Sequence, residues 1–162
     1  MPRAISSSIE IDAPRDVVWR VLRDFGSYPE WNPFTVSVVT MLEVGSAVDM
    51  QVRLRPPRTM RQVEYVSKVV EGERMCWGAN VGPSWFIRAN RCQWLEDLGD
   101  GRTRYSTSDE FEGVGVGLML RTVGPSVQRG FDDVARALKE RAEDVAASKS
   151  ALEERDGHVD EA

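Results

Sequence analysis

The chain has 162 residues, of which 41% are hydrophobic and 29% are charged, and its formal net charge is −5. This length fits one domain with a sizeable core, and the lack of a basic cluster argues against a nucleic-acid partner. No stretch reaches the roughly 18 apolar residues of a membrane span, and the first residues contain no apolar signal core, so a cytoplasmic location is expected.

Few residues are available for the commonest kinds of catalysis. The single histidine, His158, lies in a polar stretch near the end of the chain, which makes a Ser-His-Asp triad or a histidine zinc site improbable. The two cysteines, Cys76 and Cys92, have no metal-like spacing, and we expect free buried thiols. We therefore expect no metal, and any catalysis must use Arg, Tyr, Asp, Glu, Ser, Thr or water.

The first part of the chain predicts a strand, a helix and a turn. Residues 5–11 partly alternate between apolar and polar positions, as a strand does. An amphipathic helix follows, because apolar residues recur there at i, i+3, i+4 and i+7, namely Val18, Val21, Leu22 and Phe25. Residues 27–36, SYPEWNPFTV, contain two prolines and three aromatic residues, and the prolines exclude a long helix or a central strand.

Alternating segments dominate the middle of the chain. They predict further strands at residues 47–54, 60–71, 74–80, 85–96 and 102–112. On the strand at 60–71 we assign Val63, Tyr65, Ser67 and Val69 to the inner face, and on the strand at 74–80 we assign Trp77 to that face. The last two strands are joined by DLGDG, which is a strong hairpin signal.

The register of this hairpin decides which polar residues meet. A loop centred near Gly99 places Gln93 opposite Tyr105 and Arg91 opposite Thr107, with Asp109 diagonal to Arg91. A register shifted by two residues would make Arg91 and Asp109 direct partners. A buried arginine needs a carboxylate or an anionic ligand group, so this face is either a structural pair, a reversed face in solvent, or a ligand site.

The last part of the chain predicts a long helix with one apolar stripe. The stripe residues are spaced by three or four positions, namely Leu120, Val123, Val127, Phe131, Val134 and Leu138. Pro125 predicts a break near Gly124, and we interpret residues 113–117, GVGVG, as a flexible gate rather than a nucleotide loop. We expect a single domain over residues 1–145 and a polar, disordered tail over 146–162.

Three stretches resemble one known family. The stretch IEIDAPRDVVWRVLRDFGSYPEWNPF resembles the opening of the START-like SRPBCC superfamily, in its polyketide cyclase/dehydrase branch. DGRTRYSTSDEFEG, residues 100–113, resembles the penultimate hairpin of that family, and GFDDVARALKERAE resembles its C-terminal helix. The resemblance covers roughly residues 5–143. The matching positions of the opening are Ile11, Ala13, Pro14, Val18, Trp19, Asp24, Tyr28, Trp31, Asn32, Pro33 and Phe34.

This resemblance implies an α+β helix-grip fold. A seven-stranded, curved antiparallel sheet would wrap around a long C-terminal helix, with two short helices after the first strand and an internal cavity between sheet and helix. We expect the cavity to lie between the sheet and residues 118–138. Relatives often have a histidine and an aromatic residue where this chain has Arg91 and Gln93, so no set of catalytic residues transfers.

The candidate site residues combine this fold with the face assignments. The candidate catalytic residues are Arg91, Tyr105 and Asp109: arginine suits an enolate oxygen, and a tyrosine or aspartate can move a proton. The candidate ligand-binding residues are those expected to line the cavity or its mouth, namely Trp31, Tyr65, Ser67, Trp77, Gln93, Thr107, Phe111, Val127 and Phe131. For Trp31, plain packing is the competing interpretation.

Two functions stay open from the sequence, and a third is weaker. The chain resembles a polyketide cyclase/aromatase-type enzyme of secondary metabolism, a cofactor-independent lyase or isomerase that acts on a hydrophobic, oxygenated small molecule. The alternative is a non-catalytic carrier or sensor of a hydrophobic metabolite or lipid. A scaffold with a filled core is the third interpretation. The expected partner is a small molecule, with no nucleic acid, no membrane span, and a monomeric or homodimeric state.

Overall fold

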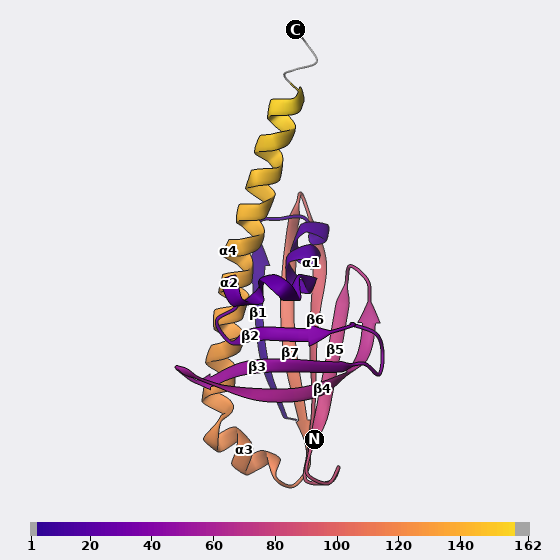
Figure 1. Ribbon diagram of the computed structural model, residues 1–162, viewed down its shortest axis with the longest axis vertical. Helices are drawn as coiled ribbons and strands as arrows, with labels where there is room; N and C mark the ends of the chain where they lie inside the picture. Colours follow the sequence, from indigo (N-terminus) through magenta and orange to yellow (C-terminus); the bar gives the residue numbers. More distant parts are fainter. Residues whose placement is uncertain (1–2, 158–162) are drawn as a thin grey trace.

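The computed structural model describes residues 3–157 of the chain. One sheet and one long helix dominate it (Figure 1). The strands are β1 (Arg3–Ile11), β2 (Thr35–Thr40), β3 (Ala47–Arg55), β4 (Arg58–Val70), β5 (Arg74–Val81), β6 (Ile87–Gly99) and β7 (Arg102–Glu112). The helices are α1 (Arg15–Arg23), a 3₁₀ turn at Phe25–Ser27, α2 (Tyr28–Trp31), α3 (Val116–Thr122) and α4 (Gly124–Gly157).

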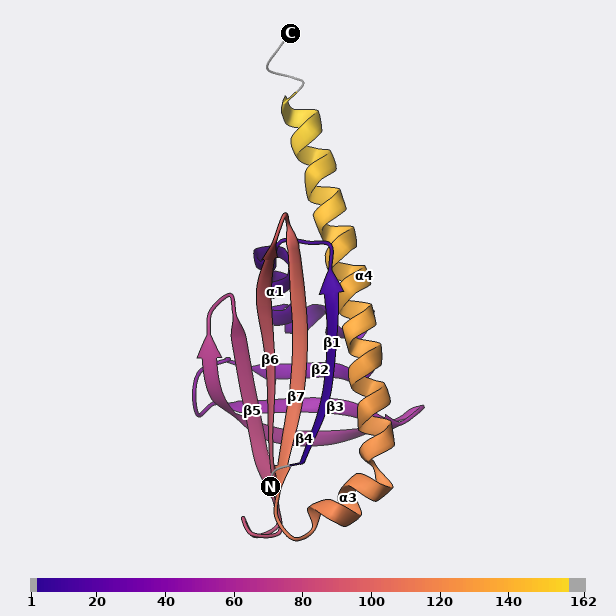
Figure 2. The ribbon, with the colours of Figure 1, turned by 180° about the vertical axis from the view of Figure 1, so that it is seen from behind.

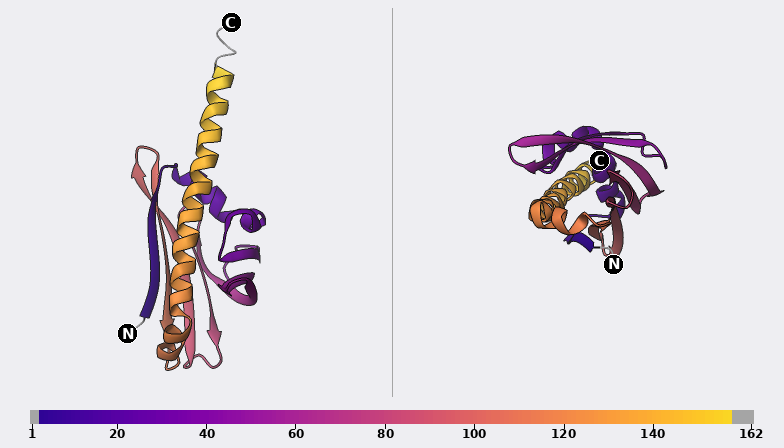
Figure 3. Two further views of the ribbon diagram at one scale, coloured as in Figure 1. Left: turned by 90° about the vertical axis from the view of Figure 1, so that its left-hand side faces the viewer. Right: turned by 90° about the horizontal axis from the view of Figure 1, so that it is seen from below.

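The sheet has seven strands in the order β1-β7-β6-β5-β4-β3-β2, and all neighbours are antiparallel. It curves so that β1, β6 and β7 lie along α4 while β2, β3 and β4 cross it (Figure 2). Seen from below, the curled sheet wraps partway around the helix and leaves one side of it open (Figure 3). The predicted helix-grip fold, with two short helices after the first strand, is therefore confirmed.

The aromatic turn SYPEWNPFTV closes one corner of this grip. Tyr28 is buried and donates its hydroxyl to the carbonyl oxygen of Leu22 at 2.5 Å. Phe34 packs edge-on against Phe131 of α4, with 5.9 Å between the ring centroids. The side-chain oxygen of Asn32 accepts hydrogen bonds from the backbone N–H groups of Phe34 and Thr35, and these bonds fix the start of β2. Burial of Tyr28 and Phe34 explains why the turn is aromatic.

The C-terminal helix breaks where its proline predicts, and it continues further than expected. Val123 separates α3 from α4, two residues before Pro125. The prediction of a disordered tail from residue 146 is wrong for residues 146–157, which extend α4 beyond the sheet (Figure 1). These residues are exposed or half-buried, so helix propensity and local pairs hold this end rather than a core. Residues 158–162 of the predicted tail, including His158, lie outside the described residues.

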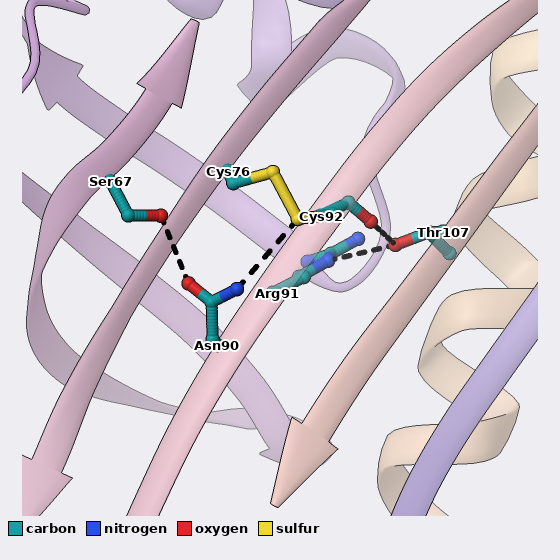
Figure 4. Close-up of a disulfide and its surroundings, with 6 residues drawn as sticks. All are labelled: Ser67, Cys76, Asn90, Arg91, Cys92 and Thr107. Carbon is teal, nitrogen blue, oxygen red and sulfur yellow. Dashed lines mark hydrogen bonds between the residues drawn. A yellow bond between two sulfur atoms is a disulfide. The ribbon is translucent and has the colours of Figure 1, made fainter.

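The two cysteines correct a second prediction. Cys76 on β5 and Cys92 on β6 are direct cross-strand partners and form a disulfide, with 4.1 Å between their Cα atoms. They are not free thiols. Sequence spacing alone did not reveal the pair, because the register of β5 and β6 brings together residues separated by 16 positions. Figure 4 shows the disulfide beside Asn90, whose amide lies 3.7 Å from the Cys92 sulfur.

Candidate functional site

A pocket of about 380 Å³ lies between the inner face of the sheet and the helices α3 and α4. Most of its lining is apolar, supplied by residues such as Met50, Val52, Trp77, Ile87, Phe111, Val127 and Phe131. Exposed Met60 and Val81 also line it and mark its rim. The volume falls within the range of small-molecule sites.

Arg91 brings a positive charge into this apolar lining. It lies on β6 and is only 8% exposed. Its Nε donates to the Thr107 hydroxyl at 3.1 Å, and its guanidinium carbon lies 4.2 Å from the centre of the Phe131 ring. Thr107 in turn donates to the carbonyl oxygen of Cys92 at 3.2 Å (Figure 4). These contacts fix the guanidinium at the pocket wall.

Asp109 lies directly opposite Arg91 in the β6–β7 register. A loop centred on Gly99 would instead pair Arg91 with Thr107, so the observed register is shifted by two residues from that one. The turn residues are Asp100 and Gly101, both with positive φ, and a bulge lies between Asp97 and Gly99. Within residues 3–157 the two side chains form no ion pair, and Asp109 Oδ1 is buried without a hydrogen-bond partner.

Glu64 on β4 adds a second carboxyl group to the pocket. Burial raises the pKa of Asp109 to about 7, against the opposing effect of Arg91. Burial also raises the pKa of Glu64 to about 7, and the nearby charge of Asp109 raises it further while Arg91 lowers it. Two carboxyl groups that are each partly protonated near neutral pH therefore share an apolar pocket with one arginine.

Sequence reasoning missed Glu64 because it assigned β4 to the wrong face. The predicted inner residues Tyr65 and Ser67 are exposed outside the pocket, and exposed Val63 only borders it, while half-buried Gln62 and Glu64 face it. A bulge between Val66 and Lys68 then shifts the alternation, so that half-buried Val69 faces inward as predicted. The sequence did contain a signal for the correct face. The inward faces of β3 and β5 were predicted correctly from their alternation, and pairing β4 with these two neighbours would have placed Glu64 inward.

The predicted site residues on β4 and in the aromatic turn lie outside the pocket. Tyr65 is 56% exposed and does not line it, which corrects the prediction that it does. Ser67 is on the outer face, where its hydroxyl donates to Asn90 at 2.9 Å (Figure 4). Trp31 is half-buried and packs edge-on against Tyr28, with 5.0 Å between centroids, so its role in the fold is packing.

Three predicted polar residues on β6 and β7 are inward but lie behind the pocket wall. Tyr105 is fully buried, and its hydroxyl donates to Gln93 at 2.8 Å. Burial raises the pKa of Tyr105. Gln93 and Thr107 are also buried, and none of the three lines the pocket. Thr107 supports Arg91 from behind through its hydrogen bond, whereas the residues that reach the pocket itself are Arg91, Asp109, Trp77, Phe111, Val127 and Phe131.

Residues 3–157 contain no group of three or more His, Cys, Asp or Glu side chains arranged to hold a metal ion. None of the helices in the same range combines the length and the apolar character of a membrane span. The charged side chains that line the pocket are Arg91, Asp109 and Glu64.

Solved structures with this fold come from several kinds of protein. The Zhui aromatase/cyclase from Streptomyces sp. R1128 is 18% identical, with a TM-score of 0.67 over 88% of this chain and 94% of that one. A START superfamily protein from Mycobacterium smegmatis is 19% identical, with a TM-score of 0.65 over 88% and 98%. Truncated norcoclaurine synthase from Thalictrum flavum is 16% identical, with a TM-score of 0.61 over 86% and 92%.

At these identities the structures show a common fold and no common activity. A search of curated protein sequences finds no match. The family model described as polyketide cyclase/dehydrase and lipid transport matches residues 2–143, which include every strand and the part of α4 that packs on the sheet. The chain therefore belongs to the polyketide cyclase/dehydrase and lipid transport family.

Proposed function

We propose that the protein is a cofactor-independent cyclase or dehydratase of secondary metabolism, which acts in the cytoplasm on a hydrophobic molecule that carries carbonyl and hydroxyl groups. The observation that carries the proposal is the placement of Arg91, Asp109 and Glu64 in one apolar pocket. Membership of the family supports hydrophobic ligand binding, and the three polar side chains support a reaction at an oxygenated carbon.

Each polar group has a distinct task in such a reaction. The guanidinium of Arg91 binds the carbonyl oxygen of the substrate and stabilises the negative charge that develops there as an enolate forms. One carboxylate of the pair removes the proton from the neighbouring carbon. The other carboxyl group, in its protonated form, donates a proton to the departing hydroxyl group, which leaves as water.

This dehydration balances without any further reactant. A C–H bond and a C–O bond break, a carbon–carbon double bond forms, and one water molecule is released. The proton that the base takes up replaces, after exchange with solvent, the proton that the acid gives away. A pair of carboxyl groups with pKa values of about 7 supplies both protonation states near neutral pH.

Binding without turnover is the second candidate function. The mainly apolar lining of the pocket favours it, because retention of a hydrophobic ligand needs little beyond shape and one polar anchor. The scaffold interpretation requires a filled core, and a pocket of about 380 Å³ weighs against it.

Binding is tested with 1,8-dihydroxyanthraquinone, a rigid aromatic ketone with phenol groups. Arg91→Leu should keep the fold and weaken binding by about tenfold or more, because it removes a charged hydrogen-bond donor. Arg88→Leu is the matched control, since Arg88 is exposed on the same strand, and it should bind as the wild type does. Equal binding by Arg91→Leu would remove Arg91 from the site.

Turnover is tested with an aryl β-hydroxy ketone, whose dehydration gives a conjugated enone that absorbs in the ultraviolet. Asp109→Asn and Glu64→Gln should each keep anthraquinone binding and lower the rate of enone formation by at least about a hundredfold. If the wild-type protein binds the anthraquinone but produces no enone above the buffer rate, the carrier function is correct and the enzymatic proposal is wrong.

A further inference from the structure

One end of the molecule has an exposed apolar surface, which we call the apolar tip and define as Val81, Trp85, Phe86, Val114 and Leu118. Trp85 is 65% exposed, Val114 is 76% exposed and Leu118 is 71% exposed. The tip lies at the lower end of Figure 1, around α3 and the β5–β6 loop, and the projecting end of α4 is at the opposite end. Exposed apolar side chains gathered in this way usually mark an interaction site.

Backbone contacts join the two segments of the tip into one unit. Val114 donates its N–H to the carbonyl oxygen of Trp85 at 3.2 Å, and Gly115 donates to that of Phe86 at 2.9 Å. The two backbone segments can lie this close only because residue 113 is glycine: a Cβ atom on Gly113 would lie 2.3 Å from the Phe86 carbonyl oxygen. The GVGVG segment is therefore packed against the β5–β6 loop, which argues against the flexible gate suggested by its sequence.

The tip is continuous with the mouth of the pocket. Val81 belongs to both, and Ile87 and Met119, which line the pocket, directly follow Phe86 and Leu118 in the chain. A surface that covered the tip would also face the pocket opening. A hydrophobic ligand could then enter or leave the pocket without crossing water.

Charge around the mouth differs from that of the chain as a whole. The net charge is −5, yet the three segments that border the mouth, residues 50–63, 74–95 and 113–131, contain no Asp or Glu. Exposed Arg58, Arg88 and Arg121 lie in these segments. Arg61 pairs with Asp49 at 2.6 Å and Arg88 with Glu112 at 3.6 Å, whereas Arg58 and Arg121 form no salt bridge within residues 3–157. The region is therefore apolar with a cationic margin, on an otherwise acidic protein.

We propose that the apolar tip docks on an anionic phospholipid surface, with Trp85 and Leu118 inserted at the headgroup level and the arginines against lipid phosphates. Tryptophan favours the boundary between headgroups and acyl chains, and basic residues beside an apolar surface add electrostatic attraction to anionic lipid. A second copy of the chain fits less well, because a symmetric contact through the tip would bring the arginines of both copies together. The proposal does not depend on the reaction in the pocket.

Tryptophan emission provides a direct measurement. Trp85 is the one exposed tryptophan of the five, since Trp19 and Trp77 are buried and the other two are half-buried. Vesicles of phosphatidylcholine with about 30 mol% phosphatidylserine should shift the emission to shorter wavelength and carry the protein down on sedimentation. Vesicles of phosphatidylcholine alone should bind much more weakly, and added salt should reduce binding to the anionic vesicles.

Matched variants locate the contact. Leu118→Ser should weaken binding to the anionic vesicles by about tenfold, whereas Leu152→Ser, an exposed leucine near the far end of α4, should leave it unchanged. Arg121→Gln should weaken binding by about fivefold, and its control Arg155→Gln, exposed on the same far end, should not. Trp85→Phe should abolish the emission shift while the protein still sediments with the vesicles.

Several results would overturn the docking proposal. One is a wild-type protein that neither sediments with anionic vesicles nor changes its emission. Another is equal weakening by Leu118→Ser and Leu152→Ser, which would show that the contact is not at the tip. A dimer that Leu118→Ser dissociates, in the absence of vesicle binding, would assign the tip to a second copy instead. Failure of anthraquinone binding would refute the proposed function and leave this proposal untouched.

Discussion

Replacement of Asp109 by asparagine should stabilise the protein at pH 8 and have little effect at pH 4. Burial raises the pKa of Asp109 to about 7 in the folded protein, whereas an aspartate in an unfolded chain ionises near pH 3.9. As the pH rises from about 4 to about 7, the unfolded chain therefore loses the proton while the folded protein keeps it, and stability falls. Asparagine, which has no proton to lose, escapes this penalty.

The magnitude follows from the size of the pKa difference. A rise of about three units corresponds to about 4 kcal/mol of unfolding free energy once the pH exceeds 7, at about 1.4 kcal/mol per unit. Water that enters the pocket screens the ionised carboxylate and reduces this value, so we expect Asp109→Asn to gain about 2 to 4 kcal/mol at pH 8. At pH 4 the difference should be less than about 0.5 kcal/mol.

Urea unfolding at the two pH values measures the difference directly, with emission from the buried Trp19 and Trp77 as the signal. Asp144→Asn is the control, because Asp144 is exposed on α4, and it should change stability by less than about 0.5 kcal/mol at either pH. A loss of stability in Asp109→Asn at pH 8 would refute the argument. It would mean that Asp109 is ionised in the folded protein and pairs with Arg91.

Three other predictions concern the framework of the fold. Gly130→Ala should lower the unfolding free energy by about 1–3 kcal/mol, because its Cβ atom would lie 2.2 Å from the Phe34 ring; unchanged urea unfolding would contradict this. Deletion of residues 146–162 should lower the melting temperature by less than about 4 °C, since α4 is mostly exposed there, and a larger drop in calorimetry would show that this end docks. Joint replacement of Cys76 and Cys92 by alanine should cost about 2–3 kcal/mol under oxidising conditions, as expected for a disulfide that closes a loop of this length; equal stability would show that the two thiols are not joined.

Most of the fold could be predicted from periodicity, because its elements bury one face. The apolar stripe of α4, the alternation of β3 and the break before Pro125 each reflect a local rule that tertiary packing does not override. The extension of α4 past residue 146 could not be predicted in this way. A helix that projects into solvent needs no apolar stripe, and its absence was interpreted as disorder.

The register of the β6–β7 hairpin was harder to predict from the sequence, because it depends on a single bulge. DLGDG predicts a turn, but a two-residue turn at Asp100 and Gly101 with a bulge after Asp97 shifts the register by two residues relative to a loop centred on Gly99. That shift decides whether Arg91 faces Thr107 or Asp109. The disulfide depends in the same way on the register of β5 and β6, which no local pattern specifies.

The faces of β4 were assigned wrongly for a reason that concerns function. The rule that apolar residues face inward assumes a filled interior, and here the inner face of β4 borders a pocket. Glu64 lines that pocket rather than a filled core, and Tyr65 can lie outside because exposing half of its surface to water costs little. A local rule that fails in this way is expected at a binding site rather than in a structural core.

The absence of an ion pair between Arg91 and Asp109 within residues 3–157 also favours a binding site over a structural core. The two residues are direct cross-strand partners on a buried face, where an ion pair would be the ordinary solution. Instead, the hydrogen bond to Thr107 and the contact with the Phe131 ring hold the guanidinium apart from Asp109, and Asp109 Oδ1 has no partner among residues 3–157. A structural ion pair would have given Asp109 a partner, because a buried carboxylate oxygen without a hydrogen bond destabilises the fold. This separation supports the proposal that a third group, such as the oxygen of a ligand, enters between the cation of Arg91 and the carboxyl group of Asp109.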